Sequence, residues 1–264
     1  MTFGDVVHII PLGYEIDRAV APFRSHKANR AHILTTQTEG AHDQAMCKRQ
    51  QFFTDKVIAE LAALDIKVRV WSVDLFDMHA VMRQVSQVIR QEKGNRIFVN
   101  MSACGRFTSI GATLAGLAHD ASVYYVEADA YPTNEEEIRE HGYTICASGR
   151  VKFIDNFKLQ LPDEIETQLL VELTERDMDT HDLLAFMVEH QVGVFADARI
   201  RECRSRYEDQ AYLTSLNKTY LDKLVKTGYI VKEKRGRRRI VKITDVGRSI
   251  AAISGLLPTV NREH

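Results

Sequence analysis

The chain has 264 residues, of which 45% are hydrophobic and 27% are charged, and its formal net charge at pH 7 is −1. This composition is typical of a globular protein with a sizeable core, and the length suits one large domain with or without a small one. No run approaches about 18 apolar residues, so we expect no membrane span and no membrane partner. The N-terminus has no basic region followed by a cleavable apolar segment, so we expect no signal peptide.

The spacing of cysteines and histidines indicates neither a metal site nor a disulfide framework. The four cysteines lie far apart and form no CxxC pair, which is typical of reduced thiols in a cytoplasmic protein. The histidines are scattered, without metal-ligand spacing to acids or cysteines. We therefore expect no bound metal and no resident cofactor.

Roughly the first 150 residues alternate short apolar runs with longer helical patterns, of which 43–64 and 77–93 are the clearest. Several apolar runs are nearly continuous in β-branched or aromatic residues, as in strands buried on both faces. The strand candidates are 6–11, 31–36, 66–73, 96–101, 122–128 and 143–147, with a closing strand within 151–162. This alternation predicts an α/β fold with a Rossmann-like, mostly parallel sheet.

The second half has a different order of elements, which predicts a winged helix-turn-helix. Pro162 and the acidic stretch 163–166 indicate a helix start, so we expect one domain over residues 1–162 and a second over 163–264. Helical patterns cover about 163–175, 179–191, 195–206 and 212–227, strand patterns cover 229–234 and 238–244, and a last helix runs from 245 to about 257.

Positive charge is concentrated in the second domain. Between Arg199 and Arg248, fifteen Lys and Arg residues stand against six Asp and Glu residues. A basic hairpin beside a polar helix suits double-stranded DNA, with the helix in the major groove and the wing on phosphates or in the minor groove. The alternative is a winged helix that docks a protein and uses its arginines only to solubilise a turn. The predicted DNA-binding residues are Ser215, Asn217, Lys218, Thr219 and Lys223 on the helix, and Arg235, Arg237, Arg238 and Arg239 on the wing.

Ligands of parallel sheets bind outside the carboxyl ends of the strands, which here are followed by the loops 11–18, 37–43, 100–109 and 127–133. The third loop leads into a Gly- and Ala-rich helix at 108–118, whose N-terminal amides could hold a phosphate. The alternative is a well-packed corner without a ligand. No GxGxxG follows the first strand and no GxxxxGK[ST] is present, which disfavours nicotinamide cofactors and nucleoside triphosphate hydrolysis.

Two stretches, 8-HIIPLGYEIDRAVAPF-23 and 98-FVNMSACGRFTSIGATLAGLA-118, resemble the N-terminal domain of archaeal transcriptional regulators in which a CRISPR-associated Rossmann fold (CARF) domain precedes a winged helix. The resemblance implies a homodimer with a cyclic oligoadenylate bound across the two CARF domains. Where Cys104 stands, family members usually have a small residue, often glycine. The ligand-binding residues expected from the resemblance and the loops are Leu12, Gly13, Tyr14, Glu15, Thr38, Asn100, Ser102, Ala103, Cys104, Gly105, Arg106 and Thr108.

We therefore predict a ligand-responsive, DNA-binding transcriptional regulator with no catalytic residues. One alternative is a ring nuclease that cleaves its cyclic ligand, in which Ser102, Arg106 and Glu15 orient a ribose hydroxyl and stabilise the developing charge. A second hypothesis concerns Cys104, which could be a reactive thiol if a nearby helix N-terminus lowered its pKa.

Overall fold

The computed structural model describes residues 4–24, 27–36, 44–159, 161–192, 195, 206–236 and 238–258. The chain divides into two compact units, Met1–Gln160 and Leu161–His264. Among the described residues, none of the helices has both the length and the apolar character that crossing a bilayer requires.

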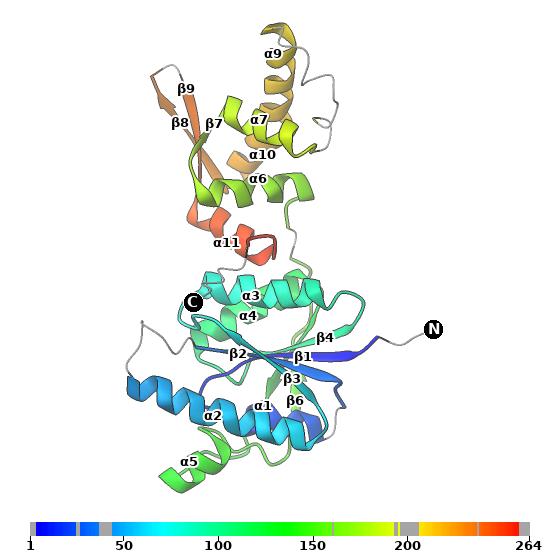
Figure 1. The fold of residues 1–264 in the computed structure, drawn as a ribbon, viewed down its shortest axis with the longest axis vertical. Helices are drawn as coiled ribbons and strands as arrows, with labels where there is room; N and C mark the ends of the chain where they lie inside the picture. The colour runs from blue at the N-terminus through cyan, green and yellow to red at the C-terminus, as the bar shows by residue number, and fades with distance from the viewer. Residues whose placement is uncertain are drawn as a thin grey trace. The chain divides into compact units, whose positions relative to one another are not determined.

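The N-terminal unit contains a six-stranded sheet in the order β3-β2-β1-β4-β5-β6 (Figure 1). Five strands are parallel and the edge strand β6 is antiparallel to β5, which confirms the predicted α/β fold with a mostly parallel sheet. The strands are β1 (Val6–Pro11), β2 (Arg30–Thr35), β3 (Lys67–Ser72), β4 (Arg96–Asn100), β5 (Ser122–Val126) and β6 (Val151–Phe153).

Helices cover both faces of this sheet. Figure 1 shows α3 and α4 on one face and α1 and α2 on the other. The helix α4 lies very close to the sheet because Gly116 has no side chain, and a Cβ there would come within 2.6 Å of Val123 Cγ2. The helices are α1 (Asp17–Val20), the 3-10 turn η1 (Ala21–Arg24), α2 (Gln44–Ala63), α3 (Met78–Gln91), α4 (Arg106–Ala118) and α5 (Glu135–His141).

The predicted strand at 143–147 is wrong, and the helix α5 was not expected. The segment 143–147 makes only an isolated bridge from Ile145 to Ala130, and β6 takes the sheet edge instead. Its backbone bonds to three other segments: Cys146 N donates to Asp17 Oδ2 at 2.8 Å, Tyr143 N donates to Tyr14 O at 3.1 Å, and Ile145 N donates to Ala130 O at 3.0 Å. In the sequence, a short apolar run that packs on a neighbouring loop cannot be told from a buried strand.

A buried ionic cluster joins β2 to the end of α3. Arg30 donates to both carboxylate oxygens of Glu92, at 2.8 and 2.7 Å. Trp71 Nε1 donates to His32 Nδ1 at 2.9 Å, and Nε2 of the same ring lies 2.9 Å from Glu92 Oε1. His32 is fully buried and its pKa is lowered by burial, while hydrogen bonding to Arg30 lowers the pKa of Glu92 to about 2. The cluster therefore holds an ionised carboxylate in the interior.

The C-terminal unit has a three-stranded sheet in the order β7-β9-β8. Asp163 and Glu166 form a capping box that begins α6, and the Thr244 side chain caps α11. The two-residue strand β7 was not predicted, because its second residue also serves as the N-cap of α7. The elements are α6 (Glu164–Glu175), β7 (Met178–Asp179), α7 (Thr180–Glu189), α9 (Arg206–Ser215), η3 (Leu216–Leu221), α10 (Asp222–Lys226), β8 (Ile230–Arg235), β9 (Arg238–Ile243) and α11 (Asp245–Ile253).

A single long helical segment, formed by α9, η3 and α10, replaces the predicted helix at 212–227. Its middle part, η3, is π-helical, and Asp222 N donates to Asn217 O five residues back. The wider turn keeps Leu216, Tyr220 and Leu221 all buried. Of the predicted helix at 195–206, residues 196–205 lie outside the described residues.

Candidate ligand pocket and nucleic-acid interface

A cavity of about 310 Å³ lies at the carboxyl ends of the parallel strands in the N-terminal unit. The loop after β1 and the loop after β4 form its floor, since Gly13 N donates to Ala103 O at 2.7 Å. α2 closes one side, and Gln50 Nε2 donates to the carbonyl oxygens of Leu12 and Gly13 at 2.9 and 3.2 Å. The lining residues are Gly13, Tyr14, Glu15, Thr36, Met46, Cys47, Gln50, Leu75, Phe76, Cys104, Gly105, Thr108 and Tyr143.

The structure brings together half of the predicted ligand residues and places the others elsewhere. Leu12 and Ala103 are fully buried beneath the cavity, and Arg106 is exposed and is not among the lining residues. Thr38 lies outside the described residues. The predicted residues that line the cavity are Gly13, Tyr14, Glu15, Cys104, Gly105 and Thr108.

Asn100 and Ser102 are buried and support the loop after β4. Asn100 Oδ1 accepts from Ser102 N at 2.9 Å and from Ser102 Oγ at 2.7 Å. Ser102 Oγ in turn accepts from Val126 N at 3.0 Å, and Asn100 Nδ2 donates to Arg18 O at 2.8 Å. The hydroxyl of Ser102 is thus engaged by the Asn100 side chain and the Val126 amide.

Three parts of the cavity wall were missed from the sequence, one of which is the segment after β3 with Leu75 and Phe76. The helix α2 contributes Met46, Cys47 and Gln50, which share a face because they are three and four residues apart. The signal that the sequence offered was Gln50, a polar residue at helical spacing from the apolar Phe53 and Val57. Tyr143 reaches the cavity from the loop after α5, next to Gly142, where a Cβ would lie 2.6 Å from Ile16 N.

Glu15 is the charged residue of the lining, and its carboxyl is mostly buried. Oε1 accepts from Thr144 Oγ1 at 2.8 Å, whereas Oε2 has no hydrogen-bond partner. Burial raises the pKa of Glu15 to about 7, although the Thr144 hydrogen bond and the Arg18 charge oppose this. Because no Lys or Arg is among the lining residues that the structure describes, a neutral or hydrogen-bond-donating group fits the cavity better than a phosphate.

The surroundings of Cys104 oppose the lowered thiol pKa that its place before a helix suggested. Burial raises the pKa of Cys104 to about 12, and the negative charge of Glu15 adds to this. Cys104 Sγ lies 3.8 Å from Met101 O. The hypothesis of a lowered thiol pKa is therefore wrong. Cys47, Cys104 and Cys146 are free thiols in the described part of the chain.

The edge of the cavity has cationic and amide groups that its interior lacks. The Arg49 guanidinium lies 5.6 Å from the ring centre of Tyr14 and 5.4 Å from that of Tyr143, and it pairs with Glu135 at 3.8 Å. α4 begins after Gly105, and no side chain caps its first turn. These N-terminal amides lie beside the lining residue Gly105, and amides at a helix N-terminus favour the binding of an anion. Among the described residues, no cluster of three or more His, Cys, Asp or Glu side chains could hold a metal ion.

In the C-terminal unit, the predicted DNA-binding residues of the helix have different environments. Lys218 and Thr219 are exposed, and Ser215 and Asn217 are half-buried. Asn217 Nδ2 donates to Leu213 O at 2.8 Å. The ammonium of Lys223 is tied to α6 by ion pairs with Glu166 at 2.6 Å and Asp163 at 3.8 Å.

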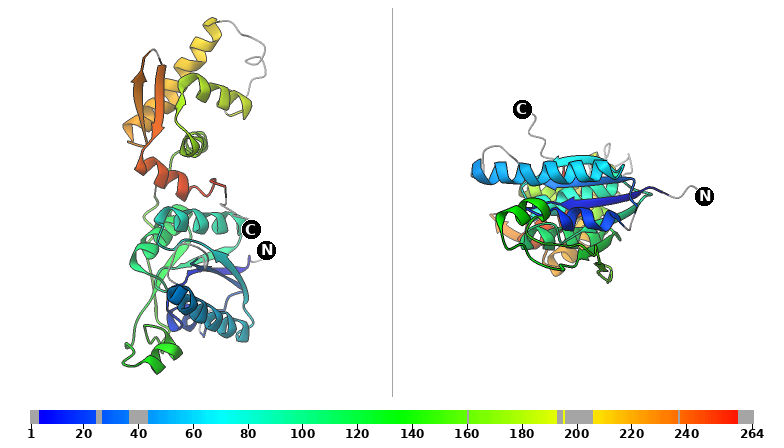
Figure 2. Two further views of the ribbon diagram at one scale, coloured as in Figure 1. Left: turned by 60° about the vertical axis from the view of Figure 1, so that its left-hand side comes forward. Right: turned by 90° about the horizontal axis from the view of Figure 1, so that it is seen from below.

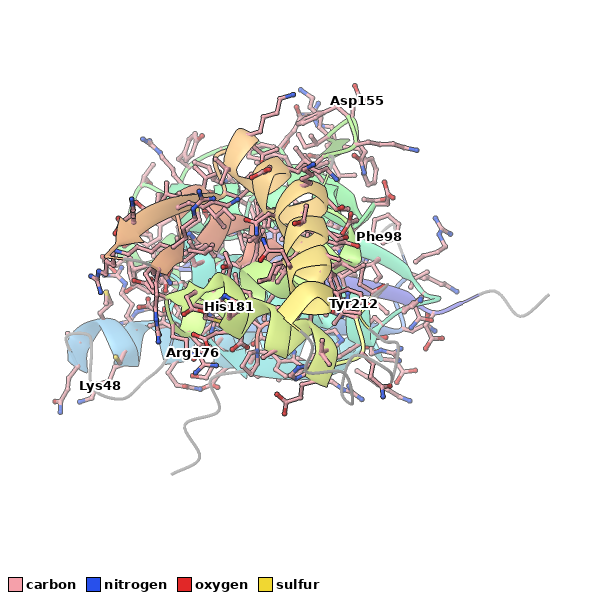
Figure 3. All side chains as sticks on the ribbon, turned by 90° about the horizontal axis from the view of Figure 1, so that it is seen from above. Lys48, Phe98, Asp155, Arg176, His181 and Tyr212 are labelled. Atoms are coloured by element: carbon pink, nitrogen blue, oxygen red, sulfur yellow. The ribbon has the colours of Figure 1, made fainter. Side chains whose placement is uncertain are left out.

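The hairpin of β8 and β9 stands beside the long helical segment, with its turn at the same end of the unit as α9 (Figures 1 and 2). In the view from above, Tyr212 marks α9 and His181 the start of α7 (Figure 3). Arg235, Arg238 and Arg239 are exposed on the hairpin. Arg237 lies outside the described residues. Lys234, a basic residue of the same stretch that was not among the predicted DNA-binding residues, pairs in register with Arg239.

Comparison with family models assigns each unit separately. Residues 6–131 match the model HFX_2341_N, which describes an N-terminal domain. Residues 165–255 match the C-terminal winged helix domain of DUF6293. The C-terminal unit is a winged helix domain. This confirms the predicted order of an α/β domain followed by a winged helix. No curated protein matches the chain.

Solved structures show a distant similarity of fold. Can2 from Sulfobacillus thermosulfidooxidans, in complex with cyclic tetra-adenylate, is 13% identical with a TM-score of 0.39, covering 93% of this chain and 63% of its own. VC1899 from Vibrio cholerae is 15% identical with a TM-score of 0.36, covering 94% and 64%. Enterococcus italicus Csm6, bound to cyclic hexa-2'-fluoro-hexa-dAMP, is 13% identical with a TM-score of 0.43, covering 86% and 56%. The present chain thus spans less than two thirds of each of these proteins.

Proposed function

We propose that this protein is a cytoplasmic, homodimeric transcriptional regulator whose N-terminal unit binds a nucleotide messenger and whose winged helix binds double-stranded DNA. The observation that carries the proposal is the combination, in one chain, of a cavity at the carboxyl edge of a parallel sheet and a winged helix with an exposed basic hairpin. The protein acts as a sensor and releases its ligand unchanged.

The cavity supports a ligand with a flat, neutral part and an anionic part. At about 310 Å³ it lies at the small end of the range of about 300 to 1,000 Å³ typical of small-molecule sites, so it holds one nucleoside-sized group. Tyr14, Phe76 and Tyr143 provide aromatic surface for a base, and the uncapped N-terminus of α4 provides amides for a phosphate. A cyclic oligoadenylate presents both groups repeatedly, and the stretches 8–23 and 98–118 resemble CARF domains.

Regulation follows from linkage between the two binding events. A ligand that prefers one arrangement of the dimer shifts the spacing of the two winged helices, and thereby changes the affinity for an operator. A two-fold dimer predicts an inverted-repeat operator with half-sites about 34 Å apart, one turn of the DNA helix.

DNA binding is tested by selecting sequences from random duplexes and measuring affinity by fluorescence anisotropy between about 50 and 200 mM salt. We expect an inverted repeat to be enriched, and affinity to fall at least tenfold, roughly, over this range because phosphate contacts release counterions. A protein-docking winged helix shows no salt-dependent retention of DNA, and that result refutes this part of the proposal.

Ligand binding is tested by calorimetry with cyclic tri-, tetra- and hexa-adenylate and with AMP as a comparison. Tyr143→Ala removes a cavity wall and should weaken binding about tenfold or more, since stacking on one aromatic side chain contributes about 1–3 kcal/mol. Tyr131→Ala is the matched control, because Tyr131 is also exposed but does not line the cavity. Binding that Tyr143→Ala leaves intact places the ligand elsewhere, and conversion of labelled ligand to linear products favours the ring-nuclease alternative.

A further inference from the structure

The two faces of the hairpin carry different charges. In an antiparallel pair, residues opposite each other lie on the same face, and alternate residues along each strand share that face. The register pairs Lys232 with Val241, Lys234 with Arg239, and Arg235 with Arg238. Lys232 and Lys234 therefore belong to one face, and Arg235 and Arg238 to the other.

The first face, here called the helix-side face, is directed to the long helical segment. Val241 is fully buried, and Lys232 Nζ donates to Asn217 Oδ1 at 3.0 Å and to Asp222 Oδ1 at 2.6 Å. Toward the turn, the same face continues with Lys234 and Arg239, which are both exposed. Neither of the two has an ion-pair partner among the residues whose side chains the structure describes.

The opposite face is largely neutralised by acids. Glu233 pairs with Lys242 at 2.7 Å, and Asp177 lies 3.7 Å from the same ammonium. Arg238 pairs with Asp179 at 3.4 Å. The remaining cation, Arg235, lowers the pKa of Glu233, although Lys242 is the larger cause. Among the side chains that the structure describes, three carboxylates thus stand against three cations on this face.

We propose that the hairpin contacts DNA through its helix-side face, with Lys234 and Arg239 as the phosphate-binding residues, and that Arg235 and Arg238 face away from the duplex. This rests on the proposed DNA binding and specifies which cations carry it. A cation without an acidic neighbour can neutralise a DNA phosphate and release the counterions bound to the DNA, which strengthens binding. A cation that is already paired with a carboxylate must first break that ion pair, so it contributes less to the affinity. On the helical segment, the exposed Lys218 directly follows Asn217, which accepts from Lys232 of the hairpin.

Lys232 has a positioning role in this arrangement. Its ammonium bridges Asn217 and Asp222 of the helical segment, while its backbone belongs to β8. It therefore fixes the hairpin relative to the helix without needing to touch DNA.

Two matched double variants in the full-length protein test the inference on the selected duplex. The first double variant combines Lys234→Gln with Arg239→Gln, and the second combines Arg235→Gln with Arg238→Gln. Each removes two positive charges within the same six-residue stretch. We expect the first pair to lower the slope of log affinity against log salt by about 1.8 and to weaken binding about 60-fold at 0.1 M salt, from about 0.9 counterions released per phosphate. We expect the second pair to change affinity less than about threefold.

The outcomes separate this inference from the proposed function. If both pairs weaken binding equally, or the second pair weakens it more, the assignment of faces is refuted although the protein binds DNA. If the wild-type protein binds no duplex, the proposed function itself is refuted. Since losing the Arg238–Asp179 pair could unsettle the start of α7, thermal unfolding is measured for each variant, and Arg235→Gln alone serves as a second control.

Discussion

Replacing Glu15 with glutamine should stabilise the protein at alkaline pH and change its stability little at acid pH. Burial raises the pKa of this carboxyl from 4.5 to about 7, so the folded chain binds the proton more tightly than the unfolded chain. Such a group contributes stability that is fully present below about pH 4.5 and is lost as the pH rises through about 7. At about 1.36 kcal/mol for each pKa unit, the ionised carboxyl costs the folded state up to about 3 kcal/mol at pH 8.

Glutamine mimics the protonated carboxyl, because its amide oxygen can still accept from Thr144 Oγ1 and it carries no charge. Unfolding in urea, followed by Trp71 fluorescence, reports on the N-terminal unit because Trp71 is the single tryptophan and belongs to β3. We expect Glu15→Gln to raise the free energy of unfolding by about 1 to 3 kcal/mol at pH 8 and by less than about 0.5 kcal/mol at pH 4.5. Glu136→Gln, on the exposed side of α5, should change neither value by more than about 0.5 kcal/mol. An equal gain at both pH values, or none at pH 8, refutes the reasoning.

Three other substitutions or treatments test the remaining structural arguments. Glu92→Gln should destabilise the N-terminal unit by about 3 kcal/mol at pH 7 in urea unfolding, because it leaves Arg30 without its buried carboxylate. The pKa of Glu92 is lowered to about 2, so the wild-type protein loses this stabilisation as the carboxylate is protonated. The difference between wild type and variant should therefore shrink as the pH falls from about 4.5 toward 2. Gly116→Val should lower the free energy of unfolding by about 1 to 3 kcal/mol or more in the same measurement, because even a Cβ at this position comes too close to Val123. The control Ala118→Val, on the half-buried side of α4, should lower it by less than about 1 kcal/mol. Cys104 should resist alkylation by iodoacetamide in the native protein at pH 8, as followed by peptide mass spectrometry, and rapid labelling there contradicts the raised thiol pKa.

The order of elements could be predicted from the sequence because local patterns determine it. Short apolar runs mark the strands β1, β2 and β4, and an apolar stripe with helical spacing marks α3. Alternation of such strands and helices predicts a parallel sheet. The winged helix follows from the helical patterns before residue 228, the basic hairpin and the last helix. The run 143–147 has the same composition as a strand, but tertiary hydrogen bonds to the loop after β1 decide its conformation.

The candidate site was predictable where strand ends define it and not where distant segments close it. Two groups of lining residues follow from the rule that parallel sheets bind ligands at their carboxyl edge, namely Gly13, Tyr14 and Glu15, and Cys104, Gly105 and Thr108. Gln50 and Tyr143 come from a helix and a loop whose positions depend on packing. On the wing, the sequence shows the arginines but not the strand register, which separates Arg239 from Arg238 and brings in Lys234.

The glycine at position 142 makes one wall of the cavity intolerant of change. Its φ angle is +84°, and a side chain there would press on the backbone of Glu15 and Ile16. Any other residue must push the neighbouring Tyr143 away from the cavity or displace the carboxyl of Glu15. Under the proposed function, a single exchange at Gly142 therefore removes ligand binding by the N-terminal unit without altering any residue of the winged helix.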